Sequence, residues 1–573
     1  MVRPRVRWRR LSNSFRPSSC SSFWRLCCAH PVSFRGDLSH DRPVPLWRRR
    51  SHHESGSGPW AYGRMADYDG HRRCGAAHRV SSPSSRRGTS HRVGRRLQCC
   101  CCRGSFHLCV GQHVRNVMTS TPNLLIILSD QLRRHALGCH GDPDSRTPHI
   151  DQLADDGVRF AQSNSTYPIC VPFRFTMMTG HYAHSRLVPG IEWRMSPAER
   201  TLADEFNEGG YETIYVGKWH LDGGHGRMGS AVQCNRTPVR RPYQGRWEKW
   251  FGFELRNGFF DTCYFEDDDP TPIPIDGYQT DGLFDVATDY LRDGRDPTRP
   301  FCMVLSVEAP HPPYEAPADL EAEWTARDIQ LPPNFRADSN EKREQLIRQR
   351  QIYYAMVENL DTNVGRMRAF LDESGLAQDT VVVFLADHGE LLGAHGLVSK
   401  QRPLEESVGV PLIVYDPRCP ERAGTVLIDP TCTEDLFPTF LGLTGRTPRD
   451  PLPGMDLSRV IRGEDHELDR DGVLLEFVAE LREGLPFYEE VWRGFRSRRY
   501  KYTVIGDKNG ARSWQLFDLE SDPWEMTNLV DDDAHRSIAA QHHVWLRQRM
   551  EETLDPLPLV PAFGELGWNQ WQP

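Results

Sequence analysis

The sequence predicts an α/β protein, an α/β/α sandwich with a mostly parallel central sheet and a smaller C-terminal α+β subdomain. Continuous rather than alternating apolar runs indicate strands that are covered on both faces, as in a parallel sheet between helices. Five such runs occur, at residues 123–129, 213–216, 301–307, 381–385 and 410–415. Helical stretches fall between these runs, so strands and helices are expected to alternate along the chain.

The predicted helices carry ordinary packing signals. The longest runs from about Glu341 to Glu373, where apolar residues recur at spacings of three and four. An earlier helix is marked at both ends, with Thr147 as the expected N-cap, Pro148 at the first helical position and Gly157 after the last turn. We interpret both as scaffold helices.

Charge divides the chain into two unequal parts. Residues 1–117 contain 23 Arg, no Lys and 5 acidic residues, a balance of +18, whereas the remainder has 47 basic and 73 acidic residues, a balance of −26. The mild formal net charge of −8 therefore hides two parts of opposite sign. The first part also holds nine of the 16 cysteines and shows no hydrophobic period.

Residues 1–117 could be a basic nucleic-acid arm or a metal-binding tract. Nucleic-acid arms usually mix Lys with Arg, and these cysteines do not form the two separated Cys-x-x-Cys pairs of a structural zinc site. We therefore interpret this part as a non-native or disordered upstream extension, with Met118 as the start. The rest is predicted to form a large α/β domain over 118–450, with a loop-rich insert at 222–280, and a subdomain over 451–573.

The sequence contains no recognisable membrane or export signal. No apolar run reaches the roughly 18 residues of a membrane helix, and no signal peptide follows Met1 or Met118. The seven cysteines after residue 117 are odd in number and scattered, which suits a reduced intracellular enzyme better than a disulfide scaffold. We expect a cytoplasmic protein without a membrane or nucleic-acid partner.

Polar residues follow two of the predicted strands directly. Asp130 and Gln131 end the first apolar run, and Asp387 and His388 end the fourth. Active groups gather at the carboxyl ends of strands in open α/β sheets, so these residues could enclose one divalent cation. Either Asp alone would more often be a helix cap or turn residue.

Cationic residues follow other predicted strands. Lys218 and His220 come after the second run, His311 after the third, and Lys400 shortly after the pair at 387–388. Singly, each would be an ordinary solvated or hydrogen-bonded side chain. Gathered at one sheet edge with Arg174, they would form a ring of cations that suits an oxyanion such as sulfate or phosphate.

A short motif supplies a possible nucleophile. Residues 170–174, Cys-Val-Pro-Phe-Arg, have the pattern Cys-x-Pro-x-Arg. By itself this pattern is weak evidence, because a lone cysteine beside a proline is usually a packing residue of the core. Together with other motifs in the same order along the chain, this motif resembles the type I, formylglycine-dependent sulfatases of the alkaline phosphatase superfamily. The motifs are, in order, Asp130-Gln131, residues 170–174, Gly217-Lys218-Trp219-His220, His311, Asp387-His388-Gly389 and Lys400. The resemblance covers about residues 122–530, and residues 516–529 are similar to the C-terminal hairpin and following loop of that family.

This resemblance implies an alkaline-phosphatase-like fold, with an antiparallel hairpin and a terminal helix in the C-terminal subdomain. It also implies a sulfuric ester hydrolase that cleaves a sulfate monoester of a small molecule or carbohydrate. A formylglycine-generating enzyme would oxidise Cys170, and the gem-diol of the resulting aldehyde would be the nucleophile. The implied ligands of one divalent cation are Asp130, Gln131, oxidised Cys170, Asp387 and His388.

The resemblance assigns the remaining site residues to binding and proton transfer. Arg174, Lys218 and Lys400 would neutralise charge on the sulfate oxygens. His311, with Lys400, would protonate the leaving alcohol, and His220 would remove a proton so that sulfate is expelled and the aldehyde returns.

Three positions depart from the usual family pattern. Phe173 replaces the serine that normally precedes the motif arginine, Gln131 replaces a second aspartate, and His388 stands where many members have asparagine. A neutral amide and an imidazole lower the ligand charge, so Mn²⁺ becomes a rival to the expected Ca²⁺.

Two other functions stay open at this point. The Asp-Gln and Asp-His pairs also look like those of phosphonate monoester hydrolases and phosphodiesterases, and a noncatalytic anion-binding relative would keep Cys170 as a thiol. Substrate choice is assigned either to the insert at 222–280, whose arginines and aromatic residues could hold an anionic sugar, or to residues elsewhere if the insert is only a surface element. Glu192 and Trp193 could also face the pocket.

Overall fold

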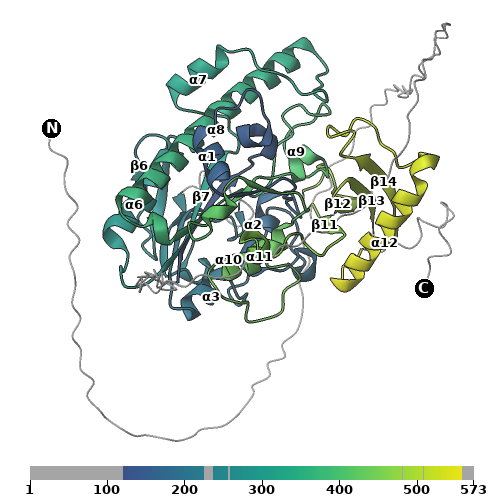
Figure 1. Cartoon of the computed structure of the whole chain (residues 1–573). Coiled ribbons are helices and arrows are strands. Elements are labelled where there is room, and N and C mark those ends of the chain that lie inside the picture. The colour runs from purple at the N-terminus through teal and green to yellow at the C-terminus, as the bar shows by residue number, and fades with distance from the viewer. Residues whose placement is uncertain (1–120, 225–235, 256–257, 481, 508, 558–573) are drawn as a thin grey trace, which may run out of the picture. The chain divides into compact units, whose positions relative to one another are not determined.

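The computed structural model describes residues 121–557, except 225–235, 256–257, 481 and 508 (Figure 1). The interpretation of residues 1–117 lies outside the described residues. The central sheet is built from β1 (Asn123–Asp130), β2 (Val158–Phe160), β3 (Glu212–Lys218), β4 (Lys249–Phe253), β5 (Thr262–Glu266), β6 (Ile273–Ile275), β7 (Phe301–Pro310), β8 (Thr380–Ala386), β9 (Leu412–Tyr415) and β10 (Thr425–Leu427).

The strand order is β10-β2-β9-β8-β1-β7-β3-β4-β5-β6. The five central strands from β8 to β4 are parallel, which confirms the mostly parallel sheet that the apolar runs predict. Antiparallel pairs occur towards both edges, where β9 pairs with β8 and with β2, and β5 pairs with β4 and β6. The run at 410–415 therefore forms a strand that opposes its central neighbour.

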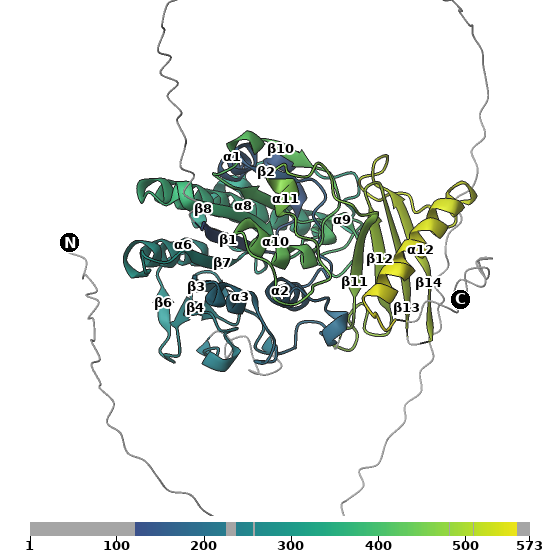
Figure 2. The ribbon, with the colours of Figure 1, turned by 60° about the horizontal axis from the view of Figure 1, so that its bottom comes forward.

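Helices cover both faces of this sheet (Figure 2). They are α1 (Pro148–Asp156), α2 (Cys170–Thr179), α3 (Leu202–Glu208), α6 (Gln279–Asp289), α7 (Ala318–Thr325), α8 (Asn340–Glu373), α9 (Glu405–Val408), α10 (Leu436–Leu443) and α11 (Ser458–Ile461). Side chains alternate across β1: Leu124 and Ile126 pack in the core that contains α2 and α10, and Leu125 and Ile127 pack in the core that contains α8.

The bounds of α1 confirm the sequence expectation, with Thr147 at the N-cap, Pro148 at the first helical position and Gly157 after the last turn, but the capping contact differs. Thr147 precedes the helix, but its side chain makes no capping hydrogen bond and its hydroxyl instead contacts Asp151 Oδ1 at 3.1 Å. The carboxylate of Asp361, on α8, accepts hydrogen bonds from the backbone N–H groups of His149 and Ile150. A side chain from a distant helix therefore satisfies the exposed donors of this N-terminus.

The region predicted as a loop-rich insert contributes strands to the sheet. Residues 222–280 include β4, β5 and β6, and β4 extends the parallel part of the sheet beyond β3. Trp247 and Trp250 from this region are fully buried in the core, where Trp250 stacks on Tyr215. These aromatic residues therefore stabilise the domain and do not face a substrate.

A second sheet forms the smaller C-terminal part. Its antiparallel strands are β11 (Gly472–Phe477), β12 (Val491–Ser497), β13 (Tyr500–Asp507) and β14 (Gly510–Asp518), in that order, and α12 (Arg536–Glu552) follows. Leu474, Tyr502 and Leu546 belong to one apolar cluster between the sheet and α12. Phe477 and Trp492 join the core of the large domain instead, so this sheet is buried on both faces.

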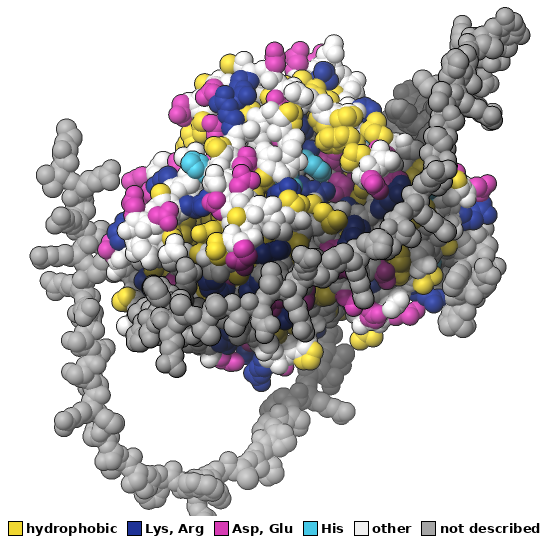
Figure 3. All heavy atoms as spheres, viewed as in Figure 1, with side chains coloured by type: hydrophobic (Ala, Val, Ile, Leu, Met, Phe, Trp, Pro, Cys, Tyr) yellow, Lys and Arg dark blue, Asp and Glu magenta, His cyan; other side chains and the backbone are white. Residues whose placement is uncertain are grey.

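Within the described part of the chain, none of the helices combines the length and apolarity that crossing a membrane requires. On the face seen in Figure 3, side chains of Lys and Arg are interspersed with those of Asp and Glu.

Candidate active site

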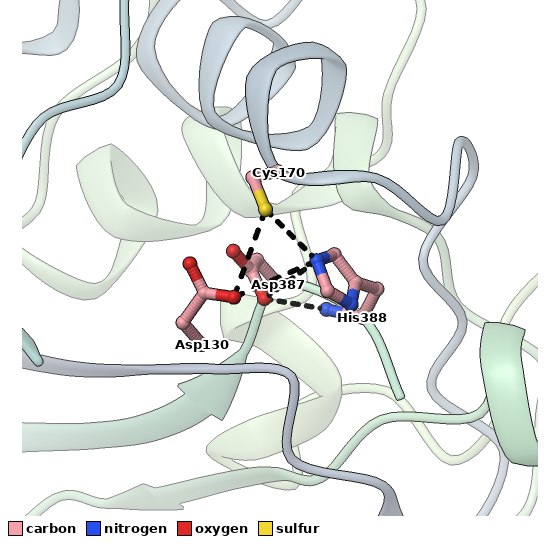
Figure 4. Close-up of side chains that lie close together, drawn as sticks. All are labelled: Asp130, Cys170, Asp387 and His388. Atoms are coloured by element: carbon pink, nitrogen blue, oxygen red, sulfur yellow. Dashed lines mark hydrogen bonds and ion pairs between the residues drawn. The ribbon is translucent and has the colours of Figure 1, made fainter. Parts of the chain in front are cut away.

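Cys170 is the first residue of α2 and is almost completely buried. Its Sγ lies 3.2 Å from Nε2 of His388, 3.3 Å from Nζ of Lys400 and 3.7 Å from Oδ1 of Asp130. Figure 4 shows the side chains of Asp130, Asp387 and His388 converging on this sulfur. Burial, together with the charge of Asp130, raises the pKa of the Cys170 thiol to about 11, so the thiol is uncharged at neutral pH.

The two carboxylates meet because their strands are neighbours. β1 and β8 are parallel and paired up to Ser129 and Ala386, so Asp130 and Asp387 follow at the same edge of the sheet. Oδ1 of Asp387 accepts hydrogen bonds from the backbone N–H groups of Gln131 and His388, both at 2.9 Å. One possible ligand atom from each of Asp130, Cys170, Asp387 and His388 lies within 4.8 Å of the others.

Arg174 neutralises part of this negative charge. It lies four residues after Cys170, one helical turn along α2. Its Nη2 is 3.1 Å from Oδ2 of Asp130 and 3.2 Å from Oδ2 of Asp387. Burial opposes ionisation of Asp130, but the charges of Lys218 and Arg174 outweigh it and hold the pKa of this carboxyl well below its usual range. Burial and the Asp130 carboxylate raise the pKa of Asp387 to about 7.

His388 is held with one ring nitrogen towards the cluster. Its Nδ1 lies 3.1 Å from the carbonyl oxygen of Gly389. Its Nε2 lies 3.2 Å from Sγ of Cys170, 3.6 Å from Oδ1 of Asp130 and 3.5 Å from Oδ1 of Asp387. Burial and the charge of Lys400 keep the pKa of His388 well below its usual value. A neutral imidazole that donates from Nδ1 leaves the Nε2 lone pair for a metal.

Two lysines border the same space. Nζ of Lys218 is 2.9 Å from Oδ2 of Asp130 and 3.3 Å from Oε1 of Glu308. These carboxylates outweigh the effect of burial and raise the pKa of Lys218, so it stays charged. Nζ of Lys400 donates to Oε1 of Gln131 at 2.6 Å as well as contacting Cys170. The amide oxygen of Gln131 is therefore already engaged by Lys400.

Two neutral histidines lie on the pocket side of these residues. His220 is buried, and its Nδ1 has no hydrogen-bond partner among the described residues. Nδ1 of His311 is 2.6 Å from the carbonyl oxygen of Pro312. Burial, followed by the charges of nearby lysines, keeps the pKa of both imidazoles well below the usual value. Each ring can therefore accept a proton at neutral pH.

Comparison with known proteins decides the family. A model described as sulfatase matches residues 122–446, and one described as N-sulphoglucosamine sulphohydrolase, C-terminal, matches residues 393–552. The chain belongs to the sulfatase family. The ulvan-active sulfatase of Formosa agariphila is 32% identical over 441 residues, which cover 76% of this chain and 82% of that relative.

Solved structures of other proteins share its fold. The yidJ protein of Bacteroides fragilis has a TM-score of 0.69 and 26% identity, covering 78% of this chain and 98% of its own. A structure in complex with its substrate D-glucosamine-2-N,6-O-disulfate has a TM-score of 0.66 and 21% identity, covering 76% and 99%. This sulfatase is thus an enzyme that hydrolyses sulfate esters.

The structure of this sulfatase brings the predicted site residues together at one end of the central sheet. They are Asp130, Gln131, Cys170, Arg174, Lys218, His220, His311, Asp387, His388 and Lys400. A pocket of about 550 Å³ opens above them and is lined by Cys170, both lysines and both pocket-side histidines. Their individual roles stay predictions.

Few of the residues that the sequence suggested for substrate choice reach this pocket. Among the described residues of the 222–280 region, only Leu255 lines it. Glu192 lines it as expected, whereas Trp193 packs edge-on against Phe175, with ring centroids 5.3 Å apart.

Two supporting residues of this sulfatase were missed by the sequence analysis. Ser306 accepts a hydrogen bond from Nη1 of Arg174 at 2.8 Å, and Glu308 pairs with Lys218. Both are polar residues inside the otherwise apolar strand β7, and both are buried. Because a buried polar group needs a partner, polar breaks within an apolar strand are the signal that could have identified them.

Proposed function

We propose that this sulfatase hydrolyses a sulfate monoester through a formylglycine formed from Cys170, with one divalent cation in the cluster around it. The observation that carries the proposal is the buried convergence of Asp130, Asp387 and His388 on Sγ of Cys170. In the unmodified chain this sulfur stands in for the oxygen atoms of the oxidised residue. An uncharged, buried thiol is a poor nucleophile, whereas the surrounding groups suit a hard oxygen ligand.

The donor set fits a divalent cation. Two buried carboxylates and a neutral imidazole whose Nε2 faces them are ligands common to Ca²⁺, Mn²⁺ and related ions. A bound cation would lower the pKa of a coordinated hydroxyl and so supply a nucleophile at neutral pH. The assignment of Gln131 as a further ligand stays a prediction, because its amide oxygen now accepts from Lys400.

The other residues would bind the sulfate group and move protons. Arg174, Lys218 and Lys400 place three positive charges beside Cys170, where they can stabilise charge on the sulfate oxygens in the transition state. His220 offers a ring nitrogen without a described partner and can accept a proton as sulfate leaves. His311 lies at the pocket wall, and the negative charge of a bound sulfate would favour its protonated form, which could then donate to the leaving alcohol.

Maturation of the cysteine would have to occur before folding is complete. Cys170 lines the pocket, but Phe173 and Arg174 are each 1% exposed, so an enzyme could not bind the whole motif on the folded chain. A formylglycine-generating enzyme would therefore act on the nascent or unfolded chain. Phe173 packs in the core of the large domain, which explains structurally how a large apolar residue is accommodated at this position of the motif.

The test is mass spectrometry of the peptide that contains Cys170, after coexpression with a formylglycine-generating enzyme, combined with turnover of an aryl sulfate. We expect a loss of about 18 Da at Cys170, from replacing CH₂SH by CHO, and no turnover by Cys170→Ala. Cys170→Ser is the matched variant, because it supplies an oxygen without an aldehyde. An unmodified thiol in an active enzyme, or full turnover by Cys170→Ala, would overturn the proposal.

We further propose a sulfated carbohydrate as the substrate class. Support comes from the related structure in complex with a disulfated glucosamine and from a relative named N-acetylglucosamine-6-O-sulfatase in Bacteroides thetaiotaomicron. A pocket of about 550 Å³ that combines cations with apolar walls also suits an anionic sugar better than a small inorganic ester.

Phosphonate monoester or phosphodiester hydrolysis is the alternative at the same site. The phosphonate monoester hydrolase of Agrobacterium radiobacter has the same fold, with a TM-score of 0.61 and 24% identity, covering 75% of this chain and 96% of its own. The Asp-Gln and Asp-His pairs at 130–131 and 387–388 are compatible with either ester. Comparing kcat/KM for matched aryl sulfate and aryl phosphonate esters decides between them, and a preference for the phosphonate would favour the alternative.

A further inference from the structure

One cation of the active-site pocket, Arg402, has neither an ion pair nor a hydrogen bond of its charged group in the described part of the chain. Arg402 lines the pocket two residues after Lys400. No hydrogen bond or ion pair of its guanidinium is found among the described residues, and its one close contact is with a ring, Cζ lying 4.7 Å from the centroid of Phe487. The other cations near Cys170 differ, because Arg174 and Lys218 each pair with buried carboxylates and Lys400 donates a hydrogen bond to Gln131.

The second arginine of the pocket wall provides a direct comparison. Arg482 also lines the pocket, but its guanidinium is 2.7 Å from the carboxylate of Glu480 and is thereby neutralised. Arg402 borders a neighbouring surface hollow that contains Glu483, Glu489 and Glu490 as well. None of these carboxylates forms an ion pair with Arg402 in the described structure.

Arg402 is held in place and is partly desolvated. Phe487, against which its guanidinium stacks, is buried and packs on Phe477, with ring centroids 5.1 Å apart. Burial lowers the pKa of Arg402, and no described carboxylate compensates for this cost. A half-buried guanidinium on an aromatic ring, with its hydrogen-bond donors unused, is a preformed site for a carboxylate, sulfate or phosphate oxygen.

We infer that Arg402 binds a second anionic group of the substrate, and that the preferred substrates are sulfated saccharides that carry a carboxylate or a further sulfate. This inference rests on the proposed function. Arg402 follows Lys400 by two residues, and the Cα atoms of such residues are at most about 7 Å apart. The second anion would therefore lie on the same sugar unit as the reacting sulfate or on its neighbour.

The rest of the pocket wall fits this substrate class. Val398 and Leu485 are 48% and 39% exposed, and they line the same pocket as Arg402. Exposed aliphatic side chains beside cations can cover the apolar face of a sugar ring while the cations bind its acidic groups. The pocket thus offers a sulfate subsite at Cys170 and an anion subsite at Arg402.

The test uses pairs of sugars that differ by one anionic group. One pair is a sulfated uronic acid and the sulfated hexose obtained by reducing its carboxyl group. The other is D-glucosamine-2-N,6-O-disulfate and N-acetyl-D-glucosamine-6-O-sulfate, in which a neutral acetyl group replaces the N-sulfate. Each sugar is measured as an inhibitor of aryl sulfate hydrolysis, which yields Ki even for sugars that are not turned over. Arg402→Gln is compared with the native enzyme, with Arg402→Lys as the charge-conserving variant.

We expect Arg402→Gln to raise Ki for the doubly anionic sugar of each pair. This increase should be at least about tenfold larger than the increase for the other sugar, which is the effect expected for the loss of one charged hydrogen bond. Arg402→Lys should recover part of the difference. Selectivity for the carboxylate pair would identify a uronic acid as the preferred ligand, and selectivity for the disulfate would identify a polysulfated sugar. Arg343 is the matched control, because it also stacks on a ring, that of Phe335, but lies outside this pocket.

Equal changes in Ki for both members of each pair would overturn the role of Arg402 and leave the proposed function intact. A native enzyme with no aryl sulfate turnover, despite oxidised Cys170, would instead overturn the proposed function. Calorimetric titration of Cys170→Ala with the same sugars then serves as the second measurement, since it reports selectivity at Arg402 without turnover.

Discussion

Arg174 forms a fully buried ion pair with Asp130, in which Nη2 of the guanidinium lies 3.1 Å from Oδ2 of the carboxylate. The same nitrogen lies 3.2 Å from Oδ2 of Asp387, while Nη1 donates to the backbone of Lys218 and to Ser306. One planar guanidinium therefore connects α2 with the ends of β1, β3 and β8 and with the middle of β7. A buried pair of this kind is costly to break, because each remaining charge would be left without a partner.

Replacing Arg174 with Lys should damage both activity and stability. Lysine keeps the charge but cannot reach the two carboxylates and two neutral acceptors with one fork. We expect kcat/KM to fall by about 10²-fold or more and the free energy of unfolding to fall by about 3 kcal/mol. Urea denaturation and aryl sulfate kinetics measure the two effects.

Arg512→Lys is the control for this substitution. Arg512 pairs with Glu490 on the surface, where both side chains are about half exposed. Its replacement should change stability by less than about 0.5 kcal/mol. If Arg174→Lys behaved like this surface variant, the buried fork would have no role in aligning the site.

Divalent cations should stabilise the protein through the cluster at Cys170. Without a cation, burial and the neighbouring carboxylate of Asp130 together raise the pKa of Asp387 to about 7. Adding Ca²⁺ or Mn²⁺ to chelator-treated protein should raise Tm, by an amount equivalent to about 2.7 kcal/mol at a concentration of 100 times Kd. Differential scanning calorimetry measures the shift, and the cation with the larger shift at equal concentration binds more tightly.

Two aspartate substitutions test whether the shift in Tm depends on the cluster at Cys170. Asp387→Asn removes a buried carboxylate and should abolish most of the shift, whereas Asp276→Asn changes an exposed carboxylate and should leave it unchanged. A full shift in Asp387→Asn would place the cation elsewhere.

The central strands, and the edge of the sheet at which the active-site residues gather, could be predicted from local sequence features. Continuous apolar runs located β1, β3, β7 and β8, because strands covered on both faces need apolar side chains at every position. Asp130 and Asp387 are 257 positions apart but follow paired strands, so their proximity could be predicted from the parallel arrangement alone. The family motifs then identified which polar residues gather there.

Features that depend on distant contacts could not be predicted in this way. The N-terminus of α1 is capped by Asp361, which lies more than 200 positions away on α8. The interpretation of the 222–280 region as loop-rich was incorrect for β4 to β6, because these strands are only three to five residues long and Gly252 and Pro274 interrupt the apolar runs of β4 and β6. Likewise, Phe487 and the pocket wall near Arg482 surround Arg402. No local sequence pattern connects these residues with Arg402.

Gly217 should tolerate no side chain, because it lets β3 approach β7. Its φ is +97°, and a Cβ at this position would lie 2.0 Å from the backbone oxygen of Ser306. Gly217→Ala should therefore displace Lys218. We expect kcat/KM to fall about tenfold or more, because the charge that is proposed to contact the sulfate would be misplaced, and the free energy of unfolding to fall by about 3 kcal/mol. Kinetics and urea denaturation of the same preparation test both effects.

Gly210→Ala separates backbone strain from the steric clash. Gly210 also has a positive φ, +80°, but a Cβ there would meet no atom within 4 Å. In this variant the strained backbone alone should lower the free energy of unfolding, by about 1 kcal/mol, and kcat/KM should not change. Similar losses in the two variants would mean that close packing against Ser306 does not position Lys218.

Protonation of His184 should stabilise the contact between the large domain and the C-terminal sheet. The buried imidazole pairs through Nδ1 with Glu476 at 2.5 Å, lies 3.7 Å from Asp555, and through Nε2 is 3.1 Å from the backbone oxygen of Thr553. Burial and the nearby Arg493 lower its pKa, but the two carboxylates outweigh them, so the pKa of His184 is raised. With both ring nitrogens facing acceptors, the charged imidazolium is the form that fits this site.

The sign of this effect follows from linkage. Because the folded pKa lies above the unfolded value of about 6.5, the stabilisation is complete below pH 6.5 and is lost as pH rises through the folded pKa. His184→Gln should therefore lower the free energy of unfolding by about 2 kcal/mol at pH 6 and by less at pH 9, whereas His466→Gln, at an exposed position, should have little effect at either pH. Urea denaturation at the two pH values measures the difference. Equal losses for His184→Gln at both pH values would mean that the charge of the imidazole does not stabilise this contact.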